Sequence, residues 1–240
     1  MKPDSESSQC HVRALLVGPL SGDSGGGALG AATPWPVTCP DPSLVIAVDG
    51  GFRACRSRGW ETHLVVGDFD SLTPRDLAEV ESQGIEVVRW PADKDFSDLD
   101  GALDEAVRRG ATHITVVGVF GGRLDHQMAV MGSLARPRGV PIIALGPTAD
   151  AGQPSDGDIV SILHAGDSVS VASRLTFSVM AIAEQASVSI RGARWPLDGA
   201  VLMPLSSVGL SNEALDGGGE VTCGKGAVAV IVPPQPEVRS

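Results

Sequence analysis

The sequence predicts an α/β domain built on a mostly parallel sheet with helices on both faces, followed by an antiparallel β-sandwich. Up to about residue 150, short apolar runs alternate with segments that carry helix start and stop signals, as in a parallel sheet covered on both faces. After that point, short segments of alternating polarity are separated by Gly, Asp, Ser and Pro, which is typical of a sandwich. The 240 residues, 42% of them hydrophobic, suffice for a real core and argue against disorder.

The strands of the first half are expected where buried apolar runs occur, several of which end in Gly or Asp. In chain order they are ALLVGPL (14–20), SLVIAVDGG (43–51), HLVVGDFDS (63–71, a strand and its loop), IEVVRW (85–90), HITVVGVFGG (113–122) and VPIIALGP (140–147).

Four helices are expected between these strands. The second has a Thr73 cap, Pro74 at its first position and Gly84 at its end, a complete set of start and stop signals. The third has acidic residues in its first turn and Arg in its last, and the fourth is amphipathic. The four helices are FRACRSRGW (52–60), TPRDLAEVESQG (73–84), SDLDGALDEAVRRG (97–110) and RLDHQMAVMGSLAR (123–136).

The second half is expected to consist of strands without helices, beginning after a boundary near 148–158 in PTADAGQPSDG. This divides the chain into domains 1–150 and 151–240. The strand-like segments are DIVSILHAG, DSVSVASR, LTFSVMAIA, ASVSIRGARW, EVTCG and GAVAVIVPP.

Charge and composition exclude several classes of partner. The net charge of -11 disfavours nucleic acid and anionic membranes, and the absence of Tyr argues against a base-stacking surface. Four scattered cysteines fit reduced thiols in a cytoplasm. The polar N-terminus predicts no signal peptide, and no apolar run long enough for a membrane span occurs.

Two short motifs near the N-terminus match known site patterns without the required context. GDSGG (22–26) fits a serine-nucleophile pattern around Ser24, and GGGALG (25–30) fits a dinucleotide fingerprint. Both patterns need a following helix, which Pro34 and Pro36 prevent. We therefore expect a flexible loop here.

Four acidic or glycine-rich segments follow predicted strands. They are VDGG (48–51), GDFDS (67–71), DKDFSD (93–98) and GVFGGRLDH (118–126). The carboxyl ends of parallel strands share one edge of a sheet, where ligands bind. We therefore expect these four segments to converge.

The convergence of Asp68, Asp70, Asp95 and Asp98 would create a repulsion that a bound cation relieves. Oxygen ligands of this kind suit Mg²⁺ with substrate phosphates. The GVFGG loop can turn backbone N–H groups toward an anion at a helix N-terminus, and Arg123 and Lys94 can hold phosphate oxygens. The sequence thus indicates a Mg²⁺–nucleotide site without a Walker motif.

Each segment also has a simpler explanation. Asp98 and Asp100 could merely favour a helix N-terminus, Asp125 and His126 could be surface residues, and Gly121 and Gly122 could form an ordinary turn. Their joint placement on one edge favours the site.

These residues resemble the thiamin pyrophosphokinase family. The family motifs D-G-G, G-D-F-D-S, K-D-x-T-D and G-G-R-x-D-H are similar to Asp49–Gly51, Gly67–Ser71, Lys94–Asp98 and Gly121–His126, with Ser97 in place of Thr. In the second half, Gly192–Leu197 resembles G-x-x-W-P-L and Ser211–Glu213 resembles S-N-E.

The resemblance implies transfer of the pyrophosphoryl group of ATP to the hydroxyl of thiamin, with Mg²⁺, by a homodimer whose sites lie between subunits; the cysteine pattern predicts that it is cytoplasmic. It also implies that domain 1–150 binds ATP and the metal, and that domain 151–240 binds thiamin and dimerises. By position, Asp68, Asp70 and Asp98 would be metal carboxylates with Asp95 close by. The nucleotide would meet Asp49, Gly50, Gly51, Lys94, Gly121, Gly122, Arg123, Asp125, His126 and Gln127. Thiamin would meet Trp195, Ser211 and Asn212, since a flat indole suits a cationic ring.

Three alternatives remain open at this point. The first is the same transfer to another alcohol, such as a hydroxymethyl pterin, and the second is a catalytically silent nucleotide- or thiamin-binding module. The third, a serine hydrolase, depends on Ser24 alone. Two further features depart from the family pattern: Gly101 lies inside a predicted helix, and the segment 18–42 is long and glycine-rich.

Overall fold

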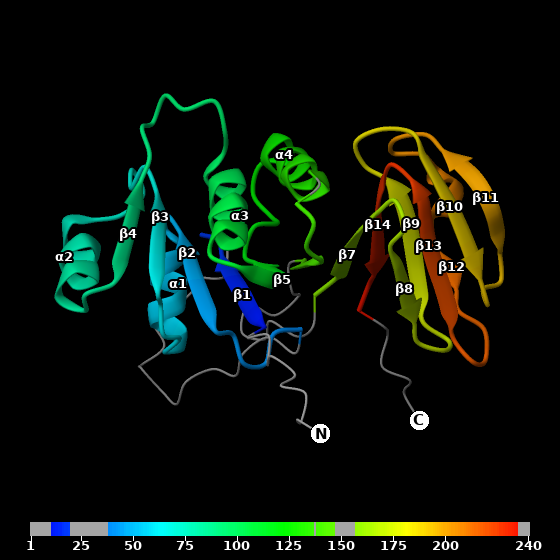
Figure 1. The fold of residues 1–240 in the computed structure, drawn as a ribbon, viewed down its shortest axis with the longest axis horizontal. Helices are drawn as coiled ribbons and strands as arrows, with labels where there is room; N and C mark the ends of the chain where they lie inside the picture. The colour runs from blue at the N-terminus through cyan, green and yellow to red at the C-terminus, as the bar shows by residue number, and fades with distance from the viewer. Residues whose placement is uncertain (1–10, 20–37, 137, 147–156, 235–240) are drawn as a thin grey trace, which may run out of the picture.

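The computed structural model describes residues 11–19, 38–136, 138–146 and 157–234. The predicted glycine-rich loop around Ser24 lies outside these residues, and so does most of the predicted boundary segment 148–158. Within the described part, the chain forms two lobes, an α/β lobe and an all-β lobe (Figure 1).

The α/β lobe contains every strand and helix predicted for the first half. The strands are β1 (Val12–Val17), β2 (Leu44–Val48), β3 (Leu64–Gly67), β4 (Glu86–Arg89), β5 (Ala111–Val117) and β6 (Ile142–Leu145). The helices are α1 (Gly51–Arg58), α2 (Pro74–Ser82), α3 (Asp98–Arg108) and α4 (Leu124–Ala135). The strands pair in parallel in the order β6-β5-β1-β2-β3-β4, so the predicted mostly parallel sheet is confirmed.

Both faces of this sheet are buried except at the edge strand β4. Ala14 and Leu16 of β1 pack into one core cluster, which also contains Leu103 of α3. Leu15 of β1 packs into a second cluster with Phe52 of α1. Because alternate residues of a strand point to opposite faces, this division explains why the strand sequences are continuously apolar rather than alternating.

The second half adds strands only. They are β7 (Ile159–His164), β8 (Ser168–Val171), β9 (Thr176–Ala181), β10 (Ala186–Arg191), β11 (Leu197–Leu202), β12 (Asn212–Glu213), β13 (Gly219–Lys225) and β14 (Ala227–Val232), with a short 3₁₀ helix, η1 (Ser207–Gly209). The strands β11 and β12 were not among the predicted segments. The sheet β11-β10-β13-β8 faces strands β7, β9 and β14 across an apolar core that includes Phe177 and Ile190, which confirms the antiparallel second part.

The two lobes share one continuous sheet. Strand β7 pairs antiparallel with β6, with Ile142 opposite Ile162, and the full order is β12-β9-β14-β7-β6-β5-β1-β2-β3-β4. This order fixes the separation between residues at its two ends.

Helix α4 differs from the expected amphipathic helix. Only Ser133, Leu134 and Ala135, at its C-terminal end, are buried, while Leu124 is 72% and Met128 is 57% exposed. Leu124 and Met128, close after the glycine loop, are therefore uncovered in the single chain. The described part of the chain contains no helix long and apolar enough to cross a membrane.

Candidate active site

Three aspartates meet at the carboxyl edge of the parallel sheet. Asp49 directly follows β2, and Asp68 and Asp70 follow β3, the neighbouring strand, in a register that pairs Val48 with Val66. One carboxylate oxygen from each aspartate lies within 4.8 Å of the other two. We call these residues the acidic triad. The sequence predicts Asp68 and Asp70 as metal carboxylates, but it assigns Asp49 to the nucleotide.

The GDFDS loop has an unusual backbone between the two carboxylates. Phe69, between them, has a φ of 68° and is 6% exposed, and the Arg89 guanidinium lies 4.9 Å from the centre of its ring. The Asp70 backbone N–H donates to Asp68 Oδ1 at 3.1 Å. A non-glycine residue in the left-handed region costs about 1–2 kcal/mol, which the burial of Phe69 offsets.

Asp49 is the member of the acidic triad that has a buried carboxylate oxygen without a hydrogen-bond partner among the described residues. Burial raises the pKa of the Asp49 carboxyl and outweighs hydrogen bonds from Ser71 and the Gly50 backbone; the nearby Asp70 and Asp98 carboxylates raise it further. Its buried Oδ1 has no hydrogen-bond partner among the described residues. An unpartnered buried carboxylate oxygen beside two other carboxylates is an environment that a cation would stabilise, and an all-oxygen donor set suits Mg²⁺.

Asp98 joins the acidic triad through Lys94. Lys94 Nζ lies 3.0 Å from Asp98 Oδ1 and 3.9 Å from Asp68 Oδ2, and the Lys94 side chain is only 8% exposed. Asp98 is the first residue of α3, which is capped by the Ser97 hydroxyl accepting from Asp100 N–H. The predicted residue Asp95 is exposed and lies outside the triad.

The GDFDS loop is supported by the ion pair of Arg53 and Asp76, two residues that were not among the predicted site residues. Arg53 Nη1 donates to the Ser71 carbonyl at 2.7 Å and lies 3.5 Å from Asp76 Oδ2. Asp76 is 2% exposed, and it also accepts from the backbone and hydroxyl of Thr73 and from Arg56. The Thr-x-x-Asp spacing is a capping-box pattern and could have identified Asp76.

Gly50 and Gly51, predicted to meet the nucleotide, have a clear packing role. A Cβ on Gly51 would lie 1.9 Å from the Val17 carbonyl oxygen, and one on Gly50 would lie 2.9 Å from Ser71 Oγ. The two glycines therefore allow α1 to begin directly against β1 and the GDFDS loop.

The GGRLDH segment forms the start of α4, as predicted. Gly121 and Gly122 have φ values of 122° and 65°, and Arg123 is the helix N-cap residue. Arg123 binds Asp125 with two hydrogen bonds, Nε to Oδ1 at 3.1 Å and Nη2 to Oδ2 at 2.5 Å, and this contact lowers the pKa of Asp125. Gln127 Nε2 contacts the Gly122 carbonyl at 3.5 Å. Arg123, Asp125 and His126 are exposed.

The residues expected to meet thiamin lie together in the all-β lobe. Trp195 is 53% exposed, and the Arg194 guanidinium lies 4.8 Å from the centre of a Trp195 ring. Asn212 is 4% exposed and bonds to the Trp195 backbone. Ser211, the residue directly before Asn212, has a φ of 54° and is exposed.

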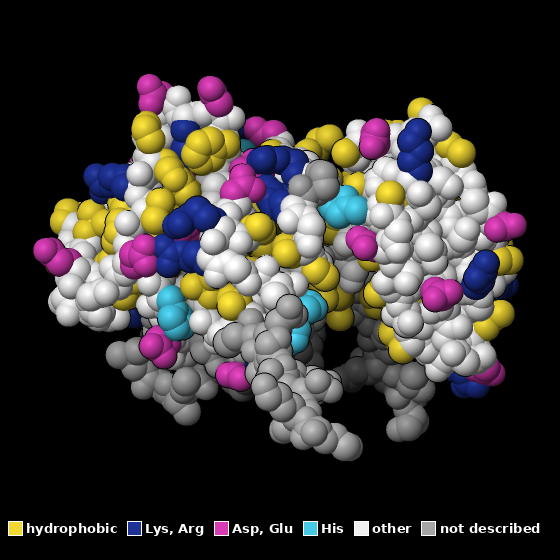
Figure 2. Space-filling view, in the orientation of Figure 1, with side chains coloured by type: hydrophobic (Ala, Val, Ile, Leu, Met, Phe, Trp, Pro, Cys, Tyr) yellow, Lys and Arg dark blue, Asp and Glu magenta, His cyan; other side chains and the backbone are white. Residues whose placement is uncertain are grey.

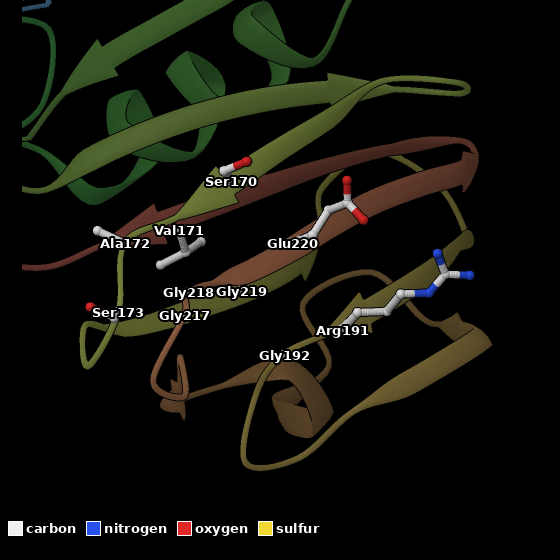
Figure 3. A pocket seen from close by; sticks show the side chains of 10 residues that line it. All are labelled: Ser170, Val171, Ala172, Ser173, Arg191, Gly192, Gly217, Gly218, Gly219 and Glu220. Carbon is white, nitrogen blue, oxygen red and sulfur yellow. The ribbon is translucent and has the colours of Figure 1, made fainter.

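A separate hollow of about 680 Å³ lies in the sheet β10-β13-β8, between Ser170, Arg191 and Glu220 and over the glycines 217–219 (Figure 3). None of the predicted site residues lines it. Charged side chains gather over the α/β lobe, whereas the visible face of the all-β lobe is mostly uncharged (Figure 2).

Two family models match the chain in the order of its lobes. The model described as thiamin pyrophosphokinase, catalytic domain, matches residues 39–144, and the model described as thiamin pyrophosphokinase, vitamin B1 binding domain, matches residues 167–228. The chain belongs to the thiamin pyrophosphokinase family. The first match contains the acidic triad and Lys94, and the second contains Trp195 and Asn212.

Individual members of the family show the same relationship. Thiamine pyrophosphokinase of Bacillus subtilis is 36% identical over 84 residues, which are 35% of this chain and 39% of that protein. Thiamin pyrophosphokinase 1 of Caenorhabditis elegans is 29% identical over 101 residues, 38% of this chain and 39% of that protein. The matched segments thus span well under two thirds of these relatives.

Solved structures of the family share the fold over nearly the whole chain. The Bacillus subtilis thiamine pyrophosphokinase superposes with a TM-score of 0.71 at 20% identity, covering 94% of this chain and 100% of that one. A family protein from Enterococcus faecalis gives a TM-score of 0.70 at 25% identity, covering 93% and 100%.

Proposed function

We propose that this protein transfers the pyrophosphoryl group of ATP to the hydroxyl of thiamin, giving thiamin diphosphate and AMP. The observation that carries the proposal is the acidic triad, with its unpartnered Asp49 oxygen, inside the segment that matches the catalytic-domain model. The match of the second half to a vitamin B1 binding domain favours thiamin over a pterin alcohol.

The residues that would hold Mg²⁺ are Asp49, Asp68 and Asp70. Asp98 is linked to them through Lys94, which contacts both Asp98 and Asp68. This assignment adds Asp49 to the carboxylates expected from the sequence. When bound, the ion would neutralise charge on the phosphate oxygens.

The polypeptide itself binds and orients the phosphates. The N-terminus of α4 follows Gly121 and Gly122, and helix N-termini bind anions through their backbone N–H groups. The His126 N–H at this end donates to Asp125 Oδ1 at 2.9 Å. Arg123 pairs with Asp125 through two hydrogen bonds. Because Arg123 is exposed, a phosphate can take the place of Asp125 as its partner. Asp125 therefore positions Arg123 in the absence of nucleotide.

Trp195 provides an exposed aromatic face for the cationic ring of thiamin. The Arg194 guanidinium covers one side of the indole, and Arg194 Nη1 lies 3.5 Å from Glu213 Oε2. Stacking and cation–π attraction then bind the substrate on the free part of the ring. The hydroxyl must approach the β-phosphorus in line with the leaving AMP oxygen, so orientation is the main contribution of the protein.

The strand order supports a homodimer with sites between its subunits, which we include in the proposal. Strands β12 and β3 are eight steps apart in the sheet, which corresponds to roughly 30–40 Å at about 4.8 Å per step. Asn212 and Trp195 of one chain therefore cannot meet the acidic triad of that chain around a small substrate. Exposed apolar side chains between Trp195 and Leu215 provide surface for a second copy: Trp195, Val201, Met203, Leu205, Val208, Leu210 and Leu215. We place the dimer in the cytoplasm, where its buried free thiols Cys39, Cys55 and Cys223 would stay reduced.

The proposal is tested by incubating the protein with MgATP and thiamin and identifying the products by mass. AMP and thiamin diphosphate should form in equal amounts, and EDTA should stop both. A hydroxymethyl pterin offered in competition should not become diphosphorylated. If neither AMP nor thiamin diphosphate forms, the protein is a binding module; if ADP and thiamin monophosphate form, the transfer is of a different kind.

A further inference from the structure

Lys94 lies in an exposed loop, yet its own side chain is buried. The loop joins β4 to α3, and its residues Asp93, Asp95 and Phe96 are exposed, whereas the side chain of Lys94 is 8% exposed. The Pro91 carbonyl lies 3.5 Å from Nζ, and the Phe96 ring centre lies 5.9 Å from it. Lysine side chains are rarely buried unless they are paired, so the acidic cluster determines where this ammonium group lies.

The ammonium group uses carboxylates that a metal ion would also use. Nζ contacts Asp98 Oδ1 at 3.0 Å and Asp68 Oδ2 at 3.9 Å. Asp68 belongs to the acidic triad. Although Asp98 Oδ1 lies next to Lys94, it is buried and accepts no directed hydrogen bond from any described residue. The contact is thus mainly electrostatic.

A divalent ion in the acidic triad would be repelled by this ammonium group. The ion would share Asp68 with Lys94, and like charges a few ångströms apart in a partly desolvated site interact strongly. Lys94 also neutralises part of the negative potential that attracts the ion. Both effects lower the affinity of the free protein for metal. The long, flexible lysine stem, anchored in a surface loop, allows the ammonium group to turn toward another anion.

We propose that Lys94 competes with the divalent cation for Asp68 and Asp98, and that nucleotide phosphates relieve this competition by pairing with Lys94. Metal and nucleotide then bind cooperatively, and the free protein takes up little metal. The inference rests on the proposed function, because it requires a metal–nucleotide substrate at this site, and it assigns Lys94 as a positioning residue that controls loading.

The experiment measures metal binding alone, without thiamin. Binding of Mn²⁺, which prefers the same oxygen ligands as Mg²⁺, is followed by electron paramagnetic resonance with and without α,β-methylene-ATP. Lys94→Met should bind Mn²⁺ alone roughly tenfold more tightly than the unmodified protein. The nucleotide analogue should tighten Mn²⁺ binding in the unmodified protein by a similar factor, and much less in Lys94→Met.

Three further variants isolate the charge. Lys94→Gln should behave like Lys94→Met, and Lys94→Arg, which keeps the positive charge, should keep the weak metal binding. Lys225→Met changes the net charge equally at an exposed residue of β13 and should leave Mn²⁺ binding unchanged. Circular dichroism melts verify that each variant is folded.

The proposal is overturned if Lys94→Met and Lys94→Gln bind Mn²⁺ alone no more tightly than the unmodified protein, or if the effect of the nucleotide analogue survives in them. If Lys94→Met and Lys94→Gln show unchanged metal binding and weaker nucleotide binding, Lys94 is a phosphate ligand only. If neither variant folds, Lys94 has a structural role instead. Because no thiamin is present, failure to form thiamin diphosphate contradicts the proposed function without affecting this result.

Discussion

The carboxamide of Asn212 bonds to both backbone groups of Trp195: Nδ2 donates to the Trp195 carbonyl at 2.7 Å, and Oδ1 accepts from the Trp195 N–H at 3.1 Å. Oδ1 also accepts from the Glu213 N–H at 2.9 Å, and Asn212 is 4% exposed. The amide is thus engaged with the backbone around Trp195, and in the proposed site Asn212 would act on thiamin through Trp195 rather than by direct contact.

We predict that Asn212→Ala raises KM for thiamin by roughly tenfold, because two buried backbone groups of Trp195 lose their partners, while KM for ATP stays unchanged. Steady-state kinetics measure both constants. In a double-mutant cycle, Asn212→Ala combined with Trp195→Ala should cost no more than Trp195→Ala alone. Fully additive losses would show that Asn212 contacts thiamin directly.

Replacing one carboxylate of the acidic triad separates function from folding. Asp70→Asn should abolish formation of AMP and thiamin diphosphate, because one of the three clustered carboxylates proposed to hold the metal is lost. The metal-free variant should melt at the same or a higher temperature, since a repelling charge is removed. Asp198→Asn, at an exposed site in β11, serves as the control and should keep normal turnover. Near-normal turnover of Asp70→Asn would contradict the metal assignment.

Asp76 makes the stability of the α/β lobe depend on pH. Burial by itself would raise the pKa of Asp76, but hydrogen bonds from Thr73 and Arg56 outweigh it and hold the pKa below its usual value. The ionised form is therefore favoured in the folded protein. Its contribution is complete above the unfolded pKa, about 3.9, and is lost as pH falls through the folded pKa.

We predict that Asp76→Asn lowers the free energy of unfolding by about 2–3 kcal/mol at pH 7, because Arg53 and Arg56 lose a buried partner. Urea unfolding at pH 7 and at pH 3 measures the effect, which should be smaller at pH 3. As a control, Asp216→Asn breaks an exposed pair with Arg174 and should change stability by less than about 1 kcal/mol. An equal loss at both pH values would contradict this account.

The sequence predicts the strands and helices well where burial is strong and local. Apolar runs identify β1, β2, β3, β5 and β6 because both faces of the sheet are covered there, whereas β4 is a mostly exposed edge strand. Strand β11 was missed because only its last residue is buried and Gly199, with a φ of 56°, interrupts it. Strand β12 has two residues, and only their pairing with β9 makes them a strand.

The candidate site was predictable where it depends on strand ends. Asp68 and Asp70 follow an apolar run, so their place at the sheet edge follows from the sequence. The inclusion of Asp49 in the acidic triad depends on the register between β2 and β3, which the sequence does not specify. The pairing of Lys94 with Asp98 could not be predicted because it depends on the path of an irregular loop. The hydrogen bonds of Asn212 to Trp195 could not be predicted because they depend on where β12 meets the segment before β11.

Two glycines inside helices should respond in opposite directions to the same substitution. A Cβ on Gly101 of α3 would lie 2.5–2.8 Å from three atoms of the Trp90 ring, whereas a Cβ on Gly132 of α4 would meet nothing within 4 Å. Alanine gains about 1 kcal/mol of helix propensity at either position. At Gly101, this gain is opposed by a shift of Trp90, whose ring packs against the core and edge-on against Phe96.

We predict that Gly132→Ala raises the free energy of unfolding by about 0.5–1 kcal/mol, and that Gly101→Ala lowers it by about 1–2 kcal/mol because overpacking outweighs propensity. Urea unfolding of both variants measures the difference, and fluorescence reports whether the environment of Trp90 changes. Gly101→Ala should also reduce turnover, because Gly101 lies one turn after Asp98 and moves with it. If both variants are more stable than the unmodified protein, the Trp90 ring can shift without destabilising the fold and Gly101 has no packing role.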